Sequence, residues 1–184
     1  MQQTEDGRLT DEDGAAGPDR GEAAGREMTA AAIAAVLERN YAVVQYHFVQ
    51  FLAEHLTDCR KSVGGDLDEV MVLAVLGQRM IGAHLARNEG DEGARDRVWM
   101  SALRLSDVTG VPRESVRRKL KRLESRGWVV QDPVLGWRLS GSLDHTQVRA
   151  DLGDVDRRGI QRLSRLLRAL MPVLTAARPR DGEG

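Results

Sequence analysis

The chain has 184 residues, of which 41% are apolar and 30% charged, and its formal net charge is −1. This composition is typical of an ordinary globular protein of one domain or two small ones, and the single Cys59 excludes an internal disulfide and a thiolate-rich metal site. The sequence has no basic start followed by an apolar core, and no apolar run approaches the roughly 20 residues that cross a bilayer. We therefore expect a cytoplasmic protein.

Residues 1–27 contain eight Asp and Glu residues against three Arg residues, which gives a local charge of −5. They mix Gly, Ala and acidic residues without apolar periodicity, so little apolar surface is present to offset the entropy of ordering the backbone. We expect a disordered acidic tail in this range.

The range 28–97 is expected to be an N-terminal helical region that serves dimerisation. From Met28 to about Cys59 the sequence has no Pro or Gly, and apolar or aromatic side chains recur every three or four residues, which predicts one long helix. The recurring residues are Ile33, Leu37, Tyr41, Val44, Phe48, Phe51 and His55, and a second apolar face adds Val36, Val43, Tyr46 and Val49. One small core cannot cover both faces, so we expect this helix to pack against a second subunit.

A second helix is expected after the break at Gly64 and Gly65. Asp66 follows as an acidic N-cap, and Glu69 stands at the third helical position. The face expected to be buried carries Val70, Leu73, Ala74, Gly77, Ile81 and Leu85. Residues 88–97 contain two glycines and almost no apolar side chains, so we expect an exposed loop there.

Residues 98–141 are expected to form a helix-turn-helix followed by a wing. A helix-turn-helix needs a short helix, a tight turn and a second helix with one exposed polar face. Leu105 and Val108 are expected to pack the first helix inward, and the small Ser106 allows the second helix to cross close by. Gly110 permits the positive φ of the turn, and Pro112 presets φ where the second helix begins.

The second helix of this motif combines a buried apolar stripe with an exposed basic face. Val116, Leu120 and Leu123 stand at i, i+4 and i+7, and residues 101–128 carry eight Lys and Arg against three Asp and Glu, a local charge of +5. Arginine can bond both O6 and N7 of guanine, and glutamate can accept from N4 of cytosine. The expected base contacts are Arg113, Glu114, Arg117 and Arg118, and the expected DNA backbone contacts are Ser115, Lys119, Lys121, Arg122, Arg126 and Arg138.

A hairpin is expected after Arg126 and Gly127. Two short stretches rich in aromatic and β-branched residues, 128–131 and 137–139, flank a turn that contains Pro and Gly, as in a small wing. We expect Arg138 to meet a phosphate. Trp128 and Trp137 are more typical of core or wing packing than of base stacking.

The range 142–184 is expected to hold a C-terminal dimerisation helix and a short tail. Its apolar residues repeat at close to 3.5-residue spacing, as in a coiled-coil seam. They are Val148, Leu152, Val155, Ile160, Leu163, Leu167, Leu170 and Leu174. The arginines between them, Arg157, Arg158, Arg162, Arg165 and Arg168, are expected to form a solvated outer face.

The segment Gly110-Val-Pro-Arg-Glu-Ser-Val-Arg-Arg-Lys-Leu-Lys-Arg-Leu-Glu124, followed by Arg-Gly-Trp-Val129, resembles the winged helix of the cyclic-AMP receptor protein family. The recognition helix of that family carries Arg-Glu-Thr/Ser-Val-x-Arg, so the resemblance implies base-contacting roles for Arg113, Glu114 and Arg118. Lys119 departs from the pattern, because the family usually has an aliphatic residue there. The glycine-rich β-roll that binds cyclic nucleotide in that family has no counterpart upstream.

The order of elements, from long helix through helix-turn-helix and wing to C-terminal helix, is similar to that of the multiple-antibiotic-resistance regulator (MarR) family. That similarity rests on layout and implies a dimer joined by its terminal helices, with a small-molecule effector as a further possibility. The expected fold is therefore mainly α, a winged helix-turn-helix with long dimerisation helices at both ends and a short two-stranded wing.

The expected function is that of a DNA-binding transcription regulator acting as a homodimer, and not of an enzyme. P-loop, dinucleotide-binding and nucleophile-elbow motifs are missing, and we expect neither a cofactor nor a metal, because the four histidines form no ligand set with usual spacing. His47 and His55 could line an effector pocket between subunits together with Tyr41, Tyr46 and Phe48, although core or interface packing is the commoner role. The alternative function is a helical adaptor whose winged helix binds a protein partner.

Overall fold

The computed structural model describes residues 28–91, 93 and 97–176, and this part of the chain is mainly helical with one two-stranded antiparallel sheet. The helices are α1 (Ala30–Arg39), α2 (Tyr41–Ser62), α3 (Leu67–Asn88), α4 (Ala102–Thr109), α5 (Arg113–Ser125) and α6 (Gln147–Ala176), and the strands are β1 (Val129–Asp132) and β2 (Gly136–Leu139). The expected tails, 1–27 and 177–184, and part of the expected loop 88–97 lie outside the described residues.

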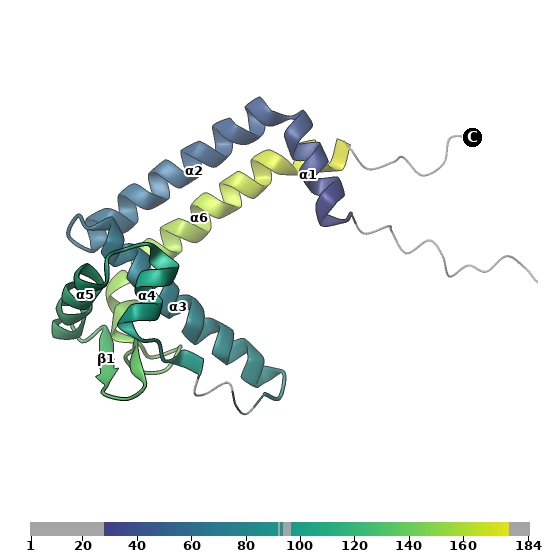
Figure 1. The fold of residues 1–184 in the computed structure, drawn as a ribbon. Coiled ribbons are helices and arrows are strands. Elements are labelled where there is room, and N and C mark those ends of the chain that lie inside the picture. The colour runs from purple at the N-terminus through teal and green to yellow at the C-terminus, as the bar shows by residue number, and fades with distance from the viewer. Residues whose placement is uncertain (1–27, 92, 94–96, 177–184) are drawn as a thin grey trace, which may run out of the picture.

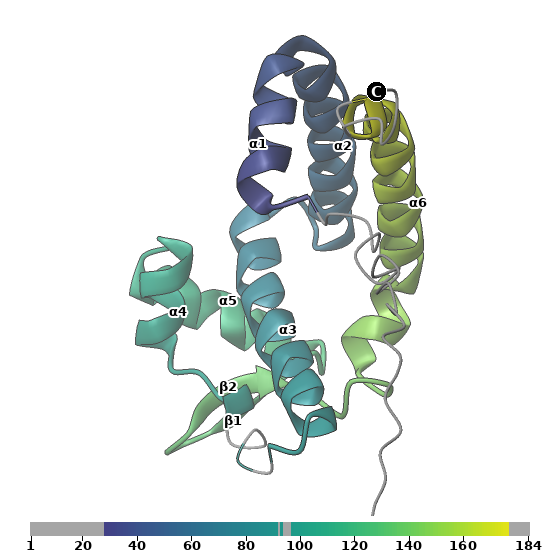
Figure 2. The same cartoon turned by 90° about the vertical axis from the view of Figure 1, so that its right-hand side faces the viewer.

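The helices divide into two groups that share α3 as a link. α2 and α6 lie side by side as an antiparallel pair, with α1 folded against both (Figure 1). Figure 2 shows α4, α5 and the hairpin gathered around α3 at the other end of the molecule. The main core lies in this second group, where side chains of α3, α4, α5 and both strands are buried together.

The single long helix expected from Met28 to about Cys59 is interrupted at Asn40, and that prediction is wrong. Asn40 ends α1 and precedes α2, with φ −108° and ψ 30°. Its side-chain Nδ2 donates to the carbonyl of Val36 at 2.9 Å, and such local bonds from Asn compete with helix continuation. The break turns α1 back, so that Val36 is buried and α1 contacts both α2 and α6.

α3 begins as the sequence predicted, but its buried face matches the expected one only in part: Leu73 is buried and Val70 packs against the core, whereas Ala74 is exposed. The Asp66 carboxylate accepts a hydrogen bond from the Glu69 N–H at 3.2 Å, which confirms the N-cap. Ile81 and Leu85, expected in the core, are 47% and 56% exposed. The buried apolar side chains of this helix are Val72, Leu73, Leu76, Met80 and Ala83. Because α3 is apolar on nearly every side, periodicity alone could not select the buried face.

By length and composition only, α3 is also long and apolar enough to cross a membrane. No segment of this kind was expected from the sequence. Core helices pass the same test, and α3 supplies Val72, Leu76 and Met80 to the core, so the finding does not by itself indicate a membrane protein.

The expected hairpin is present, and it pairs with a residue that the sequence did not single out. Val129 lies opposite Leu139 and Asp132 opposite Gly136. Met100 adds an isolated bridge, since its N–H donates to the Trp137 carbonyl at 2.9 Å and its carbonyl accepts from the Trp137 N–H at 2.8 Å. A side chain at Gly136 would place Cβ 2.5 Å from the Met100 oxygen, so this approach requires glycine.

Ion pairs join α2 to α6 and overturn one expectation for the C-terminal helix. Arg158 and Arg162 donate to the Asp58 carboxylate at 2.8 Å, and Arg165 donates to Glu54 at 2.8 Å. These arginines were expected on a solvated outer face. They instead face α2, because α6 packs along α2 over most of its length, whereas Arg157 stays exposed.

Large apolar side chains remain exposed along one edge of α2 and one edge of α6. They are between 38% and 66% exposed: Tyr41, Phe48, Val49, Leu52 and Leu56 on α2, and Ile160, Leu163, Leu167 and Met171 on α6. By helical spacing, both stripes turn away from the α2–α6 contact and toward the same side of the antiparallel pair. We call these nine side chains the apolar face.

Gly159 on α6 allows the closest approach to α2, and its substitution tests the packing of the pair. A Cβ there would lie 3.0 Å from His55 Cε1, so Gly159→Leu should overpack the contact and lower the free energy of unfolding by roughly 1–3 kcal/mol. Gly153 of the same helix meets nothing within 4 Å, and Gly153→Ala should raise the free energy of unfolding by up to about 1 kcal/mol. Urea unfolding of both variants is the measurement, and destabilisation of the two by equal amounts would contradict the assigned contact.

Candidate nucleic-acid interface

The connection between α4 and α5 is built from local hydrogen bonds. The Ser101 hydroxyl caps α4 by accepting from the Arg104 N–H at 3.1 Å, and Gly110 ends the helix with φ 71°. The Ser106 hydroxyl donates to the Val111 carbonyl at 2.7 Å, which holds the turn against α4. Pro112 then precedes α5 with φ −53°. The roles expected for Ser106, Gly110 and Pro112 agree with this geometry.

The packing of α4 differs from expectation at one position. Leu105 is fully buried as predicted, but Val108 is 50% exposed, so the prediction that it packs inward is wrong. Leu103, on the same helix, is 52% exposed. An eight-residue helix has two turns, and in α4 only Leu105 is buried.

α5 has the two faces predicted for it. Val116, Leu120 and Leu123 are fully buried against the core, which confirms the apolar stripe. The opposite side exposes Arg113, Glu114, Arg117, Arg118 and Lys121. Arg117 donates to Glu114 at 3.0 Å one turn away, an exposed pair, and Ser115 lies half-buried at the edge of this surface. The result is one rigid helix that presents cations to solvent.

A surface groove of about 390 Å³ separates α5 from the hairpin. Its lining comes from the start of α4, from Arg113, Arg117 and Lys121 of α5, and from residues 131–134, 136 and 137 of the hairpin. The Lys121 ammonium lies 5.1 Å from the Trp137 ring centroid and donates to Gln131 at 3.0 Å. One wall of the groove is therefore cationic, which suits a polyanion.

Two further arginines that were expected to contact DNA lie over indole rings. The Arg126 guanidinium is 5.0 Å from the Trp128 ring and the Arg138 guanidinium 4.9 Å from the Trp99 ring. Arg138 also donates to the carbonyls of Leu139 and Gly141, at 2.8 and 3.1 Å. Trp128 and Trp137 are buried as predicted. Cation–π contacts thus hold Arg126 over the buried Trp128 ring and Arg138 over the Trp99 ring.

Lys119 is not a surface residue, and its predicted contact with a DNA phosphate is wrong. It is 5% exposed, and its Nζ donates to both carboxylate oxygens of Asp66, at 2.7 and 2.6 Å, and lies 3.2 Å from Asp68. Arg122 donates hydrogen bonds to the same Asp66 carboxylate, at 2.5 Å, and to the buried Glu69, at 3.1 Å. Asp66, Glu69, Lys119 and Arg122 form what we call the ion cluster, and Arg122 is accordingly withdrawn from the expected phosphate contacts.

A sequence signal for the ion cluster existed. Lys119 stands three residues after Val116 and four before Leu123, on the side of α5 that carries the buried stripe. A lysine on that side needs a carboxylate partner, and the acidic run Asp66, Asp68 and Glu69 offers carboxylates.

The ion cluster holds the pKa of Asp66 well below its ordinary range. Partial burial by itself raises this pKa, but hydrogen bonds from Lys119, Arg122 and the Glu69 N–H outweigh burial and lower the pKa from 3.8 to about 2. Asp58 behaves similarly at the α2–α6 contact, where the hydrogen bond from Arg158, opposed by burial and aided by Arg162, lowers its pKa to about 2.

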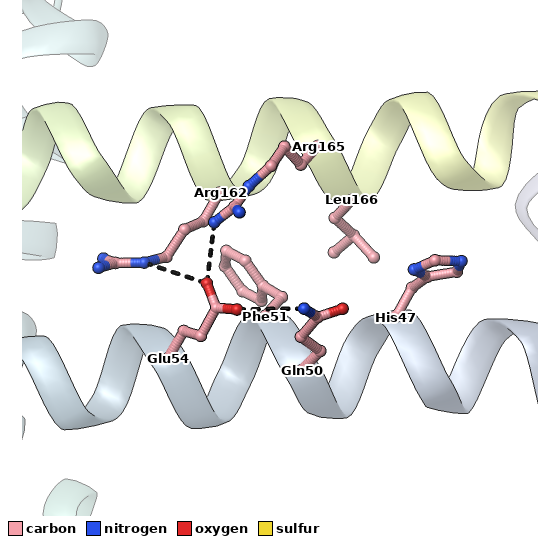
Figure 3. A pocket seen from close by; sticks show the side chains of 7 residues that line it. All are labelled: His47, Gln50, Phe51, Glu54, Arg162, Arg165 and Leu166. Atoms are coloured by element: carbon pink, nitrogen blue, oxygen red, sulfur yellow. Dashed lines mark hydrogen bonds and ion pairs between the residues drawn. The ribbon is translucent and has the colours of Figure 1, made fainter.

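The histidines expected to line an effector pocket lie between α2 and α6 but are not gathered in one site. His47 borders a hollow of about 60 Å³ with Gln50, Phe51 and Glu54 of α2 and with Arg162, Arg165 and Leu166 of α6 (Figure 3). His55 stacks on Phe51 and lies 3.6 Å from the Cys59 sulfur, whereas Tyr41, Tyr46 and Phe48 point to solvent. Small-molecule pockets usually hold roughly 300–1,000 Å³, so the hollow alone suits no ligand of that size. An effector site between subunits stays a prediction.

Comparisons with protein-family models, curated proteins and solved structures found no match to this chain. The resemblances to two regulator families therefore stay predictions. Within the described residues, His, Cys, Asp and Glu side chains nowhere form a group of three that could hold a metal ion.

The two lowered carboxyl pKa values predict a loss of stability in acid. A carboxyl whose folded pKa lies below its unfolded value stabilises the fold above the unfolded pKa, and the contribution disappears as pH falls through the folded pKa. The free energy of unfolding should therefore fall between about pH 5 and pH 2, with Asp66 contributing roughly 1–2 kcal/mol after allowance for solvent screening. Urea unfolding across this range should give a flatter profile for Asp66→Asn, and Asp107→Asn on exposed α4 is the control. An unchanged profile in Asp66→Asn would contradict the role of the ion cluster.

Proposed function

We propose that the protein is a sequence-specific, DNA-binding transcription regulator that places α5 in the major groove of duplex DNA. In this proposal α4, the Gly110 turn and α5 form a helix-turn-helix, and β1 and β2 form its wing. The observation that carries the proposal is the exposed basic face of α5, on a helix whose opposite face is fixed by three fully buried side chains. The proposal includes a cytoplasmic location, where bacterial-type DNA is found.

Four side chains of α5 are assigned to bases. Arg113, Arg117 and Arg118 are exposed near the start of the helix, where a recognition helix meets base edges. Each arginine can bond O6 and N7 of guanine, and Glu114 can accept from cytosine N4. Arg117 and Glu114 are paired at 3.0 Å in an exposed contact, which contacts to bases would replace at little cost.

Side chains at the rim of the same surface are assigned to contact the DNA backbone. Lys121 borders the groove between α5 and the hairpin, while Arg126 and Arg138 lie over indole rings at the hairpin's base. Ser115 offers a hydroxyl at the edge of α5. Phosphate contacts of this kind fix the orientation of the protein and carry little sequence information.

The second part of the proposal is a homodimer formed through the apolar face. Nine large apolar side chains on one side of the α2–α6 pair exceed what monomers commonly leave exposed. A second copy packed around a two-fold axis would cover the same residues on both subunits and produce a four-helix arrangement. The two α5 helices would then read half-sites about 34–36 Å apart.

A protein-binding adaptor is the second candidate, and exposed apolar side chains beside the basic face favour it. Leu103 and Val108 of α4 are about half exposed, and Val134 at the hairpin tip is 91% exposed. An adaptor would use these side chains and would tolerate loss of the base-reading arginines.

The roles on α5 predict a distinct pattern of binding losses. Arg113→Ala and Arg118→Ala should each cost roughly 1–3 kcal/mol on a duplex selected from a random library and should relax base choice, whereas Lys121→Ala should weaken selected and random duplexes alike. Arg157→Ala, exposed on α6, is the control for loss of one cation. Fluorescence anisotropy titrations measure all four variants. Equal losses on both duplexes for Arg113→Ala and Arg118→Ala would contradict the base assignment, and no duplex binding by the wild type would favour the adaptor.

Disruption of the apolar face should abolish dimerisation and operator binding together. The variant is Leu163→Asp combined with Leu167→Asp, because two unpaired charges would then have to be buried in the interface. Ala150→Asp combined with Gln161→Asp adds the same charge at exposed positions of α6 outside the apolar face. Sedimentation at micromolar concentration should give a dimer for the wild type and the control, and a monomer for the first variant. A monomeric wild type, or a first variant that stays dimeric and binds normally, would contradict the homodimer.

A further inference from the structure

The ion cluster lies at the joint between the α2–α6 pair and the DNA-binding unit. Gly64 and Gly65, with φ 84° and 97°, connect α2 to α3, and Asp66 follows them directly as the α3 N-cap. The Arg60 Nε of α2 donates to the Gly65 carbonyl at 2.9 Å. Asp66 is thus the first residue after the connection from α2, and Lys119 and Arg122 of α5 bind its carboxylate.

The ion cluster is a directional contact between α5 and this joint. Asp66 accepts from Lys119 with both oxygens and from Arg122 with one, across 53 and 56 residues of sequence. Arg122 also binds Glu69, which is 1% exposed and stands one turn farther along α3. Charge-assisted hydrogen bonds are roughly twice as strong as neutral ones, so a change in the orientation of α5 that breaks them is costly.

The apolar contacts between α5 and the core do not have that directionality. Its buried side is the aliphatic stripe of Val116, Leu120 and Leu123, and apolar burial depends on area more than on direction. Core packing keeps α5 close to α3, but three apolar side chains restrict the direction of the α5 axis less than charge-assisted hydrogen bonds do. Buried ionic groups are often replaceable by apolar side chains without loss of stability, so their value can lie in selecting one arrangement.

We propose that the ion cluster sets the orientation of α5 relative to the α2–α6 pair, and that Asp66 and Lys119 are therefore positioning residues that determine which half-site spacing the protein accepts. This inference rests on the proposed DNA binding by a homodimer. In such a dimer the α2–α6 pairs fix the two-fold axis, so the angle between α5 and α2 fixes the separation of the two recognition helices.

The test uses the full chain carrying Asp66→Asn and Lys119→Met together. The two substitutions together remove one anion and one cation. The Asn amide can still cap α3, and Arg122 stays paired with Glu69. Asp154→Asn with Arg157→Met is the matched control, because it removes an exposed pair of the same charges on α6. If the first double variant does not fold, Lys119→Gln, which keeps a donor without the charge, takes its place.

The first readout is independent of DNA. Nitroxide labels at Ala53→Cys on α2 and Ser125→Cys on α5, in a Cys59→Ser background diluted with unlabelled protein, report the distance within one subunit. The wild type and the control should give one narrow distribution, and the ion-cluster variant a broadened or shifted one. An unchanged distribution in the ion-cluster variant would overturn the positioning role.

The second readout is affinity for paired half-sites, taken from duplexes selected by the wild type and separated by varied spacers. Two base pairs added to the spacer rotate one half-site by about 70° relative to the other. The wild type should then lose roughly tenfold or more in affinity, a loss similar to that from one mismatched base pair. The ion-cluster variant should lose less than about threefold for the same change, with random-duplex affinity within about twofold of the wild type. Equal spacing penalties in wild type and variant would overturn the proposal, whereas absence of wild-type duplex binding would contradict the proposed function and leave the label distances to decide the positioning role.

Discussion

The contact on which the described structure most depends is the ion pair between Asp66 and Lys119. α5 carries six cationic side chains in thirteen residues, and a helix this basic can pack against a core only if the cations on its inner side are neutralised. Asp66 and Glu69 of α3 neutralise Lys119 and Arg122. The other four cations, Arg113, Arg117, Arg118 and Lys121, then occupy one exposed face, and that face is the basis of the proposed function.

The same pattern of charge pairing organises the other group of helices. Arg158, Arg162 and Arg165 of α6 are bound by Asp58 and Glu54 of α2, so half of the six arginines of α6 pair with α2 inside the subunit. Among the exposed residues of the α2–α6 pair are the nine side chains of the apolar face. The molecule thus presents a cationic face at one end and the apolar face along the helix pair, which suits a polyanion at one surface and a second copy at the other.

Local chemistry made much of this fold predictable. The Asp66 cap, the Gly110 turn, the stripe of Val116, Leu120 and Leu123, and the hairpin all follow from residues close in sequence whose preferences agree with the final structure. The exposed positions of Arg113, Glu114, Arg117, Arg118 and Lys121 follow from the same stripe, since they lie on its far side.

The errors came from contacts between residues distant in sequence. The Asn40 break is local in mechanism, but its consequence is the burial of Val36 in a contact with other helices that no pattern within α1 reveals. The pairing of Lys119 with Asp66 spans 53 residues, so patterns within single segments predicted Lys119 at the surface and Asp66 only as an N-cap. The buried face of α3 was misassigned because a helix apolar on most sides offers several equivalent faces, and only its neighbours choose among them.

The central claim is that the basic face of α5 binds the phosphate-rich surface of duplex DNA, and the salt dependence of binding tests it most directly. Each phosphate contact releases condensed counterions, so the logarithm of the binding constant should fall linearly with the logarithm of salt concentration, by about 0.9 per contact. Four contacts from each subunit of a dimer would give a slope of roughly −7 on random duplex DNA. We expect a steep slope of this order, and a slope near zero would contradict binding of the basic face to DNA phosphates.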